Sequence, residues 1–244
     1  MVDPVVGVYP DLEALSQAAA STFAAAAGEA VATRGRFTLA LAGGRTPRRL
    51  YELLAGPYRK RVPWAHALLF WGDERYVAHA DPESNYRMAR ETMIDHLPVP
   101  AAQVHPMPTH QVDPAEAARA YEAILRRRFA GEAFPTFDLA LLGMGADGHT
   151  ASLFPGTAAL ADRQGWVAVG ESPTAPSVRL TLTLPALAAA RQVIFLVTGA
   201  DKAKVVREIL SDPRAARLRY PAARVLASGR AYWYLDAAAA ALLP

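Results

Sequence analysis

Asp147 and His149 lie two positions apart in a glycine-rich turn, and they are the side chains of this sequence best suited to acid–base chemistry. The turn follows the apolar run 137–142, which we expect to be a buried strand. Open α/β sheets bind their ligands outside the carboxyl ends of their strands. Glycines let backbone N–H groups approach an anion, and a histidine can accept a proton near neutral pH. The turn therefore predicts chemistry on a small, negatively charged substrate.

A second pair of glycines, Gly43 and Gly44, follows the predicted strand 37–42 and leads through Arg45 to Thr46. The first N–H groups of a helix, together with the positive end of its dipole, favour a phosphate. Thr46 would either cap the helix that begins here or donate its hydroxyl to such a phosphate. Phosphate binding and a plain strand-to-helix turn both fit these residues.

Asp73, Glu74 and Arg75 directly follow the predicted strand 68–71. Because unpaired charge is costly to bury, we do not expect the two carboxylates to be buried for stability. Asp73 is a candidate acid–base or orienting group, and the planar guanidinium of Arg75 suits an anion. A surface ion pair is the alternative interpretation of this segment.

Two more cations lie close to predicted strands. Arg179 begins the run RLTLTLP, and Lys202 lies just inside a helix that follows the predicted strand 192–198. A lysine near a helix N-terminus opposes the helix dipole unless an anion is bound there. Lys202 is therefore a candidate anion ligand and Arg179 is a second one, and a solvated surface charge is the alternative for each.

A dinucleotide site is another interpretation of the first turn, because Gly143, Gly145 and Gly148 have the spacing G-x-G-x-x-G. The helix that should follow is interrupted by Pro155 and Gly156, and no acidic residue ends a strand about 20 residues later. We therefore expect no nicotinamide cofactor. The histidines are scattered and the sequence has no cysteine, so we expect no metal site either.

Short apolar runs alternate with helical patterns along the chain, as is typical of α/β proteins. Continuous apolar strands of this kind are buried on both faces. We predict a Rossmann-like, doubly wound, mostly parallel sheet with helices on both faces, formed by a single domain over residues 1–244. The predicted strands are 5–9, 37–42, 68–71, 137–142, 166–169, 178–184, 192–198 and 232–235. The predicted helices begin near residues 11, 46, 84, 113, 185 and 201.

The composition excludes several classes of protein. The formal net charge of the 244 residues is +3 and no long run of Lys and Arg occurs, so we expect no nucleic-acid partner. The N-terminal residues lack the pattern of a signal peptide, and no apolar run approaches the ~20 residues that span a bilayer. We expect a cytoplasmic protein that does not bind membranes, whose oligomeric state the sequence does not indicate.

Taken together, the four loops resemble the 6-phosphogluconolactonase family over nearly the whole chain. The most specific matches are GMGADGHTASLFPG and WGDER. The resemblance implies a doubly wound fold and hydrolysis of 6-phospho-D-glucono-1,5-lactone to 6-phospho-D-gluconate, the second step of the oxidative pentose phosphate pathway. No cofactor is implied. The other matching segments are LALAGGRTPRRLYELL, VRLTLTLPAL and FLVTGADKAKVV.

The resemblance also implies roles for individual residues. His149 would be the general base that activates water, with Asp147 beside it, and Asp73 and Arg75 would face the substrate. Arg45 stands where a small residue is common in the family, and it would either contact the phosphate or point outward. The implied phosphate-binding residues are Gly43, Gly44, Thr46, Arg179 and Lys202.

Two rival functions fit the same scaffold. Glucosamine-6-phosphate deaminases are related to the lactonases, but their motif, DGHIAFNE, has a glutamate five residues after the histidine. Phe154 occupies that position here, which favours the lactonase. A non-catalytic sugar-phosphate sensor would keep the phosphate loops and lose the acid–base residues, whereas this chain retains Asp73, Asp147 and His149.

Overall fold

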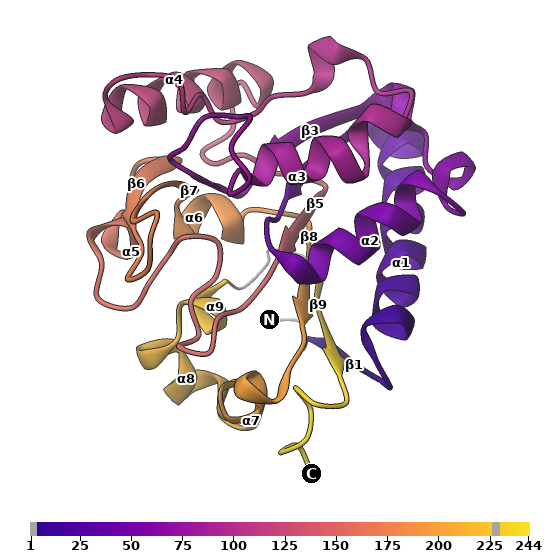
Figure 1. Ribbon diagram of the computed structural model, residues 1–244, viewed down its shortest axis with the longest axis vertical. Coiled ribbons are helices and arrows are strands. Elements are labelled where there is room, and N and C mark those ends of the chain that lie inside the picture. The colour runs from indigo at the N-terminus through magenta and orange to yellow at the C-terminus, as the bar shows by residue number, and fades with distance from the viewer. Residues whose placement is uncertain (1–3, 226–229) are drawn as a thin grey trace.

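A six-stranded sheet forms the centre of the computed structural model, which describes residues 4–225 and 230–244 (Figure 1). The strand order is β1-β9-β8-β5-β2-β3, and every neighbouring pair is parallel. Parallel neighbours need crossover connections, which helices supply here. The strands are β1 (Val5–Tyr9), β2 (Phe37–Leu41), β3 (Ala67–Trp71), β5 (Leu139–Leu142), β8 (Gln192–Val197) and β9 (Arg230–Asp236).

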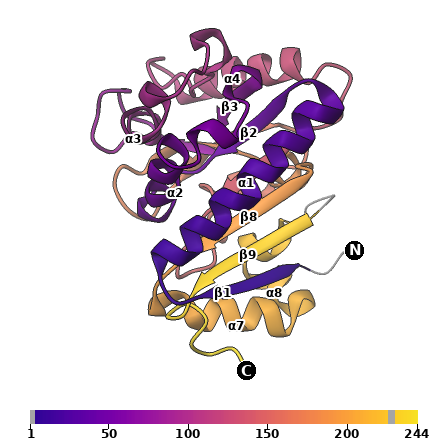
Figure 2. The same cartoon turned by 90° about the vertical axis from the view of Figure 1, so that its right-hand side faces the viewer.

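Helices cover both faces of this sheet, which confirms the predicted doubly wound fold. The long helix α1 (Leu12–Arg34) packs with α2 (Arg45–Ala55) on one face, and α7 (Ala203–Ser211) and α8 (Pro213–Arg219) lie on the other (Figure 2). In the part of the chain that is described, no helix is long and apolar enough to cross a membrane. The remaining α-helices are α3 (Asn85–Thr92), α4 (Pro114–Arg128), α5 (Ala158–Ala161), α6 (Leu184–Ala188) and α9 (Pro221–Arg224).

Local sequence signals set the ends of α1. The Asp11 side chain accepts a hydrogen bond from the Ala14 backbone N–H at 2.8 Å, as an N-cap does. The helix ends at Gly35, whose φ of 71° is left-handed and therefore favours glycine. On the buried face, Phe23 is fully enclosed and packs edge-on against the Phe37 ring of β2.

The central strands bring the predicted loops to one edge of the sheet. Every residue of β2, β3 and β5 is buried, which explains why these segments read as continuous apolar runs. The parallel register pairs Leu39 with both Leu69 and Leu139, so the three strands end at the same level. The turns that follow them therefore lie side by side.

A second, three-stranded sheet is antiparallel and has the order β4-β7-β6. It is formed by β4 (Asp73–Arg75), β7 (Val178–Leu182) and β6 (Val167–Glu171). The predicted strands 166–169 and 178–184 exist but belong to this sheet rather than to the parallel one. The sequence did not predict β4, because three charged residues carry no strand signal.

Candidate active site

A cavity of about 460 Å³ lies at the carboxyl ends of β2, β3, β5 and β8. This is the position at which α/β sheets bind ligands. All four predicted loops contribute to its walls. The predicted site residues that line the cavity are Gly43, Gly44, Arg45, Thr46, Asp73, Arg75, His149, Arg179 and Lys202. Asp147 does not line it and touches it only through His149.

His149 and Asp147 form a hydrogen-bonded pair. The distance between His149 Nδ1 and Asp147 Oδ1 is 2.6 Å, and the same oxygen accepts the His149 backbone N–H at 3.1 Å. Burial raises the pKa of Asp147, but the hydrogen bonds from His149 outweigh it and hold the pKa below its usual value. The carboxylate is therefore ionised, and it favours the tautomer with the proton on Nδ1. In that tautomer Nε2 is the proton acceptor.

Two glycines of this turn are required by its internal packing. Gly145 N–H donates to His149 O at 3.0 Å, and a Cβ on Gly145 would come within 2.1 Å of His149 Nδ1. Gly148 has a φ of 77°, and a Cβ there would lie 2.4 Å from the Tyr220 ring. Gly145 and Gly148 thus shape the turn that presents His149.

Phe154 covers one side of the His149 ring. Its ring centroid lies 4.2 Å from that of His149, at an interplanar angle of 35°. The position at which the deaminase motif has a glutamate therefore carries an apolar ring in contact with His149. Such a neighbour restricts the orientations of the imidazole.

The loop after β2 forms another wall. Gly44, with a φ of 97°, is the N-cap of α2, so Thr46 lies within the first turn and the prediction that it caps the helix is wrong. The Thr46 hydroxyl instead lies 2.9 Å from the Thr198 hydroxyl at the end of β8. Gly43 serves packing: a Cβ on it would come within 1.9 Å of the Asn85 amide oxygen.

Lys202 belongs to a 3-10 turn, Ala200–Lys202, that precedes α7 rather than to the helix itself. Its ammonium lies 2.6 Å from the Asp201 carboxylate, and its side chain is about one-fifth exposed. The lysine is therefore partly neutralised by its neighbour. It still borders the cavity, as does the exposed Arg45, whose charge also lowers the pKa of Asp201 after the larger effect of Lys202.

Glu74 departs from the prediction, because it is buried with a relative exposure of 1%. Its carboxylate accepts hydrogen bonds from the backbone N–H groups of Arg75, Asn85 and Tyr86 and from the Ser84 hydroxyl. Burial raises the pKa of Glu74 to about 7, against the opposing effect of the three N–H bonds. Glu74 thus connects β4 with the start of α3, and its hydrogen bonds offset the free-energy cost of burying the carboxyl group.

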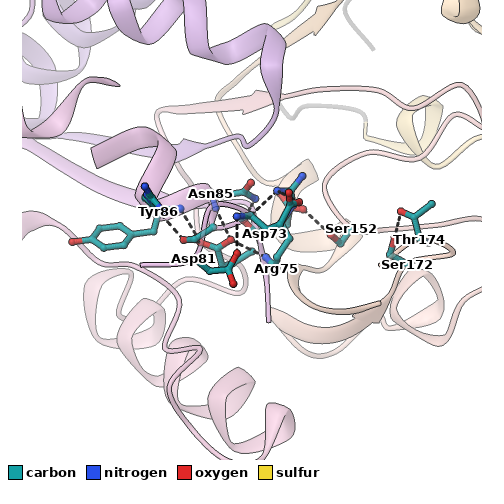
Figure 3. A network of polar contacts seen from close by, with 12 residues as sticks. Asp73, Arg75, Asp81, Asn85, Tyr86, Ser152, Ser172 and Thr174 are labelled. Atoms are coloured by element: carbon teal, nitrogen blue, oxygen red, sulfur yellow. Dashed lines mark hydrogen bonds and ion pairs between the residues drawn. The ribbon is translucent and has the colours of Figure 1, made fainter. Parts of the chain in front are cut away.

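Asp73 is half-buried and projects into the cavity. Its Oδ2 accepts a hydrogen bond from the Ser152 hydroxyl at 2.6 Å (Figure 3). Ser152 is 2% exposed and follows Ala151, whose φ of 48° is unusual for a residue other than glycine. The contact connects β4 with the segment that follows His149.

Arg75 and Arg179 are direct neighbours in the register of the antiparallel sheet. Arg75 donates to Glu83 O at 2.6 Å, whereas Arg179 is 6% exposed and its Nη1 has no hydrogen-bond partner among the described residues. Burial lowers the pKa of Arg179, and the charge of Arg75 lowers it further. A buried guanidinium with an unpaired donor at a cavity wall is suited to an anionic ligand.

Three polar side chains that line the cavity were not among the residues predicted from sequence: Asn85, Ser152 and Thr198. Asn85 carries a usable signal, because it is the only asparagine in the chain. Ser152 and Thr198 carry none, since serine and threonine are common at turns and strand ends. No group of three or more His, Cys, Asp or Glu side chains suited to a metal ion occurs within residues 4–225 and 230–244.

Comparisons with known proteins identify the family of this chain. Residues 10–233 match the family model described as glucosamine-6-phosphate isomerases/6-phosphogluconolactonase. The 6-phosphogluconolactonase of a Synechocystis strain is 48% identical over 85% of both chains, and that of a Nostoc strain is 42% identical over 98% of both. The structure of Trypanosoma brucei 6-phosphogluconolactonase superposes with a TM-score of 0.87, covering 100% of both chains at 33% identity. This chain therefore belongs to the glucosamine-6-phosphate isomerase/6-phosphogluconolactonase family.

Proposed function

We propose that this protein hydrolyses 6-phospho-D-glucono-1,5-lactone to 6-phospho-D-gluconate. The observation that carries the proposal is the His149–Asp147 pair, with Nδ1 and Oδ1 2.6 Å apart, at the wall of a cavity that also holds the buried Arg179. A base and an anion site in one cavity suit a substrate with an electrophilic carbonyl and a phosphate. The relatives named 6-phosphogluconolactonase support the same reaction.

The reaction needs one base and positive charge near the carbonyl. His149 Nε2 takes a proton from water as the water oxygen attacks the lactone carbonyl carbon. Arg75 supplies positive charge against the oxyanion that forms. The bond between the carbonyl carbon and the ring oxygen then breaks, and the ring oxygen takes the proton from His149 to become a hydroxyl. This transfer returns His149 to its neutral form, and the new carboxylic acid loses its proton to solvent to give 6-phospho-D-gluconate.

Asp147 and Asp73 have supporting roles in this proposal. Asp147 orients the imidazole and stabilises its protonated form during the reaction. Asp73, held by Ser152, faces the sugar ring and accepts hydrogen bonds from it. The phosphate lies at the wall formed by Gly43, Gly44, Arg45 and Thr46, with further charge from Arg179 and Lys202. In this proposal a single domain over residues 1–244 acts in the cytoplasm on a free sugar-phosphate lactone, independently of nucleic acid and membranes.

Deamination of glucosamine 6-phosphate is the second candidate, because the family model covers both activities. The Phe154 ring against His149 disfavours it, since it removes the carboxylate of the deaminase motif. The test supplies lactone by oxidising glucose 6-phosphate in place and follows its disappearance above the spontaneous rate. Ammonia release from glucosamine 6-phosphate is measured in parallel. We expect acceleration with the lactone alone, and ammonia release without lactone hydrolysis would contradict the proposal.

A further inference from the structure

Asn85 has a position that the proposed reaction does not yet use. This residue is the first of α3 and the only asparagine of the chain, and it borders the cavity although its relative exposure is 2%. Figure 3 shows it beside Asp73. Asparagine is seldom buried without hydrogen-bonding partners, so the partners of this side chain indicate its role.

The side chain of Asn85 is held in one orientation. Its backbone N–H donates to the buried Glu74 carboxylate at 2.7 Å, and its Nδ2 donates to Asp73 O at 3.0 Å. The amide also packs directly over Gly43, where a Cβ would lie 1.9 Å from Oδ1. Glycine at position 43 therefore leaves the space that this amide occupies. The close packing also prevents the amide from rotating freely.

Part of the hydrogen-bonding capacity of this amide is unused. A primary amide has two N–H donors and an oxygen that accepts two hydrogen bonds. Among the described residues, the side chain makes one hydrogen bond, to Asp73 O. One N–H and the oxygen are therefore left at the edge of the cavity. We propose that Asn85 is a substrate-binding residue that hydrogen-bonds a hydroxyl group of the lactone ring.

A hydroxyl is the ligand that matches this amide. A hydroxyl both donates and accepts, as the amide does, whereas a phosphate oxygen only accepts and suits the cationic side chains elsewhere in the cavity. The neighbouring Asp73 carboxylate repels a phosphate and accepts hydrogen bonds from hydroxyls. Asn85 and Asp73 together thus form the part of the cavity that recognises the sugar, and this inference rests on the proposed lactonase activity.

The test compares wild type with Asn85→Ala on the full lactone and on three phosphorylated lactones that each lack one hydroxyl, at C2, C3 or C4. We expect kcat/KM of wild type to fall about tenfold for one of the three analogues. Asn85→Ala should lose about tenfold on the full lactone and should no longer discriminate against that same analogue. A purely structural role would lower kcat/KM by one common factor for all four substrates.

Control variants distinguish a loss of substrate recognition from a general loss of structure. Thr92→Ala removes a hydroxyl at the far end of α3, where it bonds Met88 O, and should leave kcat/KM unchanged. If Asn85→Ala does not fold, as judged by circular dichroism, Asn85→Ser is used in its place. Unchanged discrimination among the analogues by either folded variant overturns the inference about Asn85. Absence of lactone hydrolysis by wild type would instead overturn the proposed function.

Discussion

The two sheets of this molecule contribute to the cavity in different ways. The parallel sheet has buried, apolar strands and places its polar residues in the turns that follow them, as at Gly43–Thr46 and around His149. The small antiparallel sheet carries Asp73, Arg75 and Arg179 within its strands. In the parallel sheet, the buried strands stabilise the fold and the turns carry the polar residues of the cavity. In the antiparallel sheet, the charged residues of the cavity belong to the hydrogen-bonded strands themselves.

This difference predicts how each region responds to substitution. A change in a turn of the parallel sheet should affect catalysis and leave stability nearly intact. A change in the antiparallel sheet should alter both, because the residues that line the cavity there also belong to the paired strands. Changes at Gly145, Glu74, Arg179 and Tyr220 test this contrast, in order of decreasing expected effect.

Gly145→Ala should lower kcat by about 10²-fold or more. The new Cβ would come within 2.1 Å of His149 Nδ1 and would displace the base from Asp147. Steady-state rates with the lactone measure the effect. Gly28→Ala in α1 is the matched control, because a Cβ there meets nothing within 4 Å. Wild-type kcat in Gly145→Ala would show that the packing of this turn does not position His149.

Glu74 should give the antiparallel region a dependence of stability on pH. Its pKa of about 7 in the folded chain is raised by burial above that of an unfolded glutamate, near 4.3. The unfolded chain therefore releases this proton first, and the free energy of unfolding falls as the pH rises through the window between the two values. We expect a loss of about 2 kcal/mol between pH 5 and pH 8 from this group.

Urea unfolding of wild type and Glu74→Gln at these two pH values checks the sign and size of this loss. Glutamine does not titrate, so the difference in stability between wild type and variant should shrink at pH 8 relative to pH 5. A difference that stays constant with pH would mean that Glu74 has an ordinary pKa in the fold.

Arg179→Met should raise KM for the lactone about tenfold, with a smaller change in kcat. The variant should also be more stable than wild type, because it removes a buried cation that lies beside Arg75 and has an unpaired Nη1. Kinetics and thermal melts measure both effects, with the exposed Arg119→Met on α4 as control. An unchanged KM would remove Arg179 from the anion site.

Tyr220→Phe should have the smallest effect. The Tyr220 ring packs against Gly148, and its hydroxyl donates to Glu208 at 2.5 Å, so the substitution keeps the packing and removes one hydrogen bond. We expect the melting temperature to fall by about 2 °C and kcat to change by less than about threefold. A large loss of kcat here would show that the hydroxyl, rather than the ring, supports the turn.

The parallel sheet was more predictable from sequence than the antiparallel one. Apolar runs and capping residues such as Asp11 located its strands and helices, because these signals are local. Parallel strands end at a common edge of the sheet. The fold class alone therefore predicted that His149, Gly44 and Lys202 would lie around one cavity. The resemblance to a known family added the roles of these residues.

The remaining features depend on contacts between distant segments. The burial of Glu74 could not be predicted from sequence, because it depends on hydrogen bonds from the N–H groups of Asn85 and Tyr86 at the start of α3. The Asp73–Ser152 hydrogen bond joins residues 79 positions apart, and neither residue signals the other in sequence. Thr46 does not cap α2 because the N-cap is Gly44, two residues earlier in the chain.

The rate of lactone hydrolysis by His149→Ala tests the central claim most directly. Lactone is generated in place, spontaneous hydrolysis is subtracted, and circular dichroism confirms that the variant is folded. We predict that kcat falls by about 10²-fold or more, because no other group takes the proton from water in the proposed reaction. A folded variant that retains most of the wild-type kcat would contradict the assignment of His149 as the base.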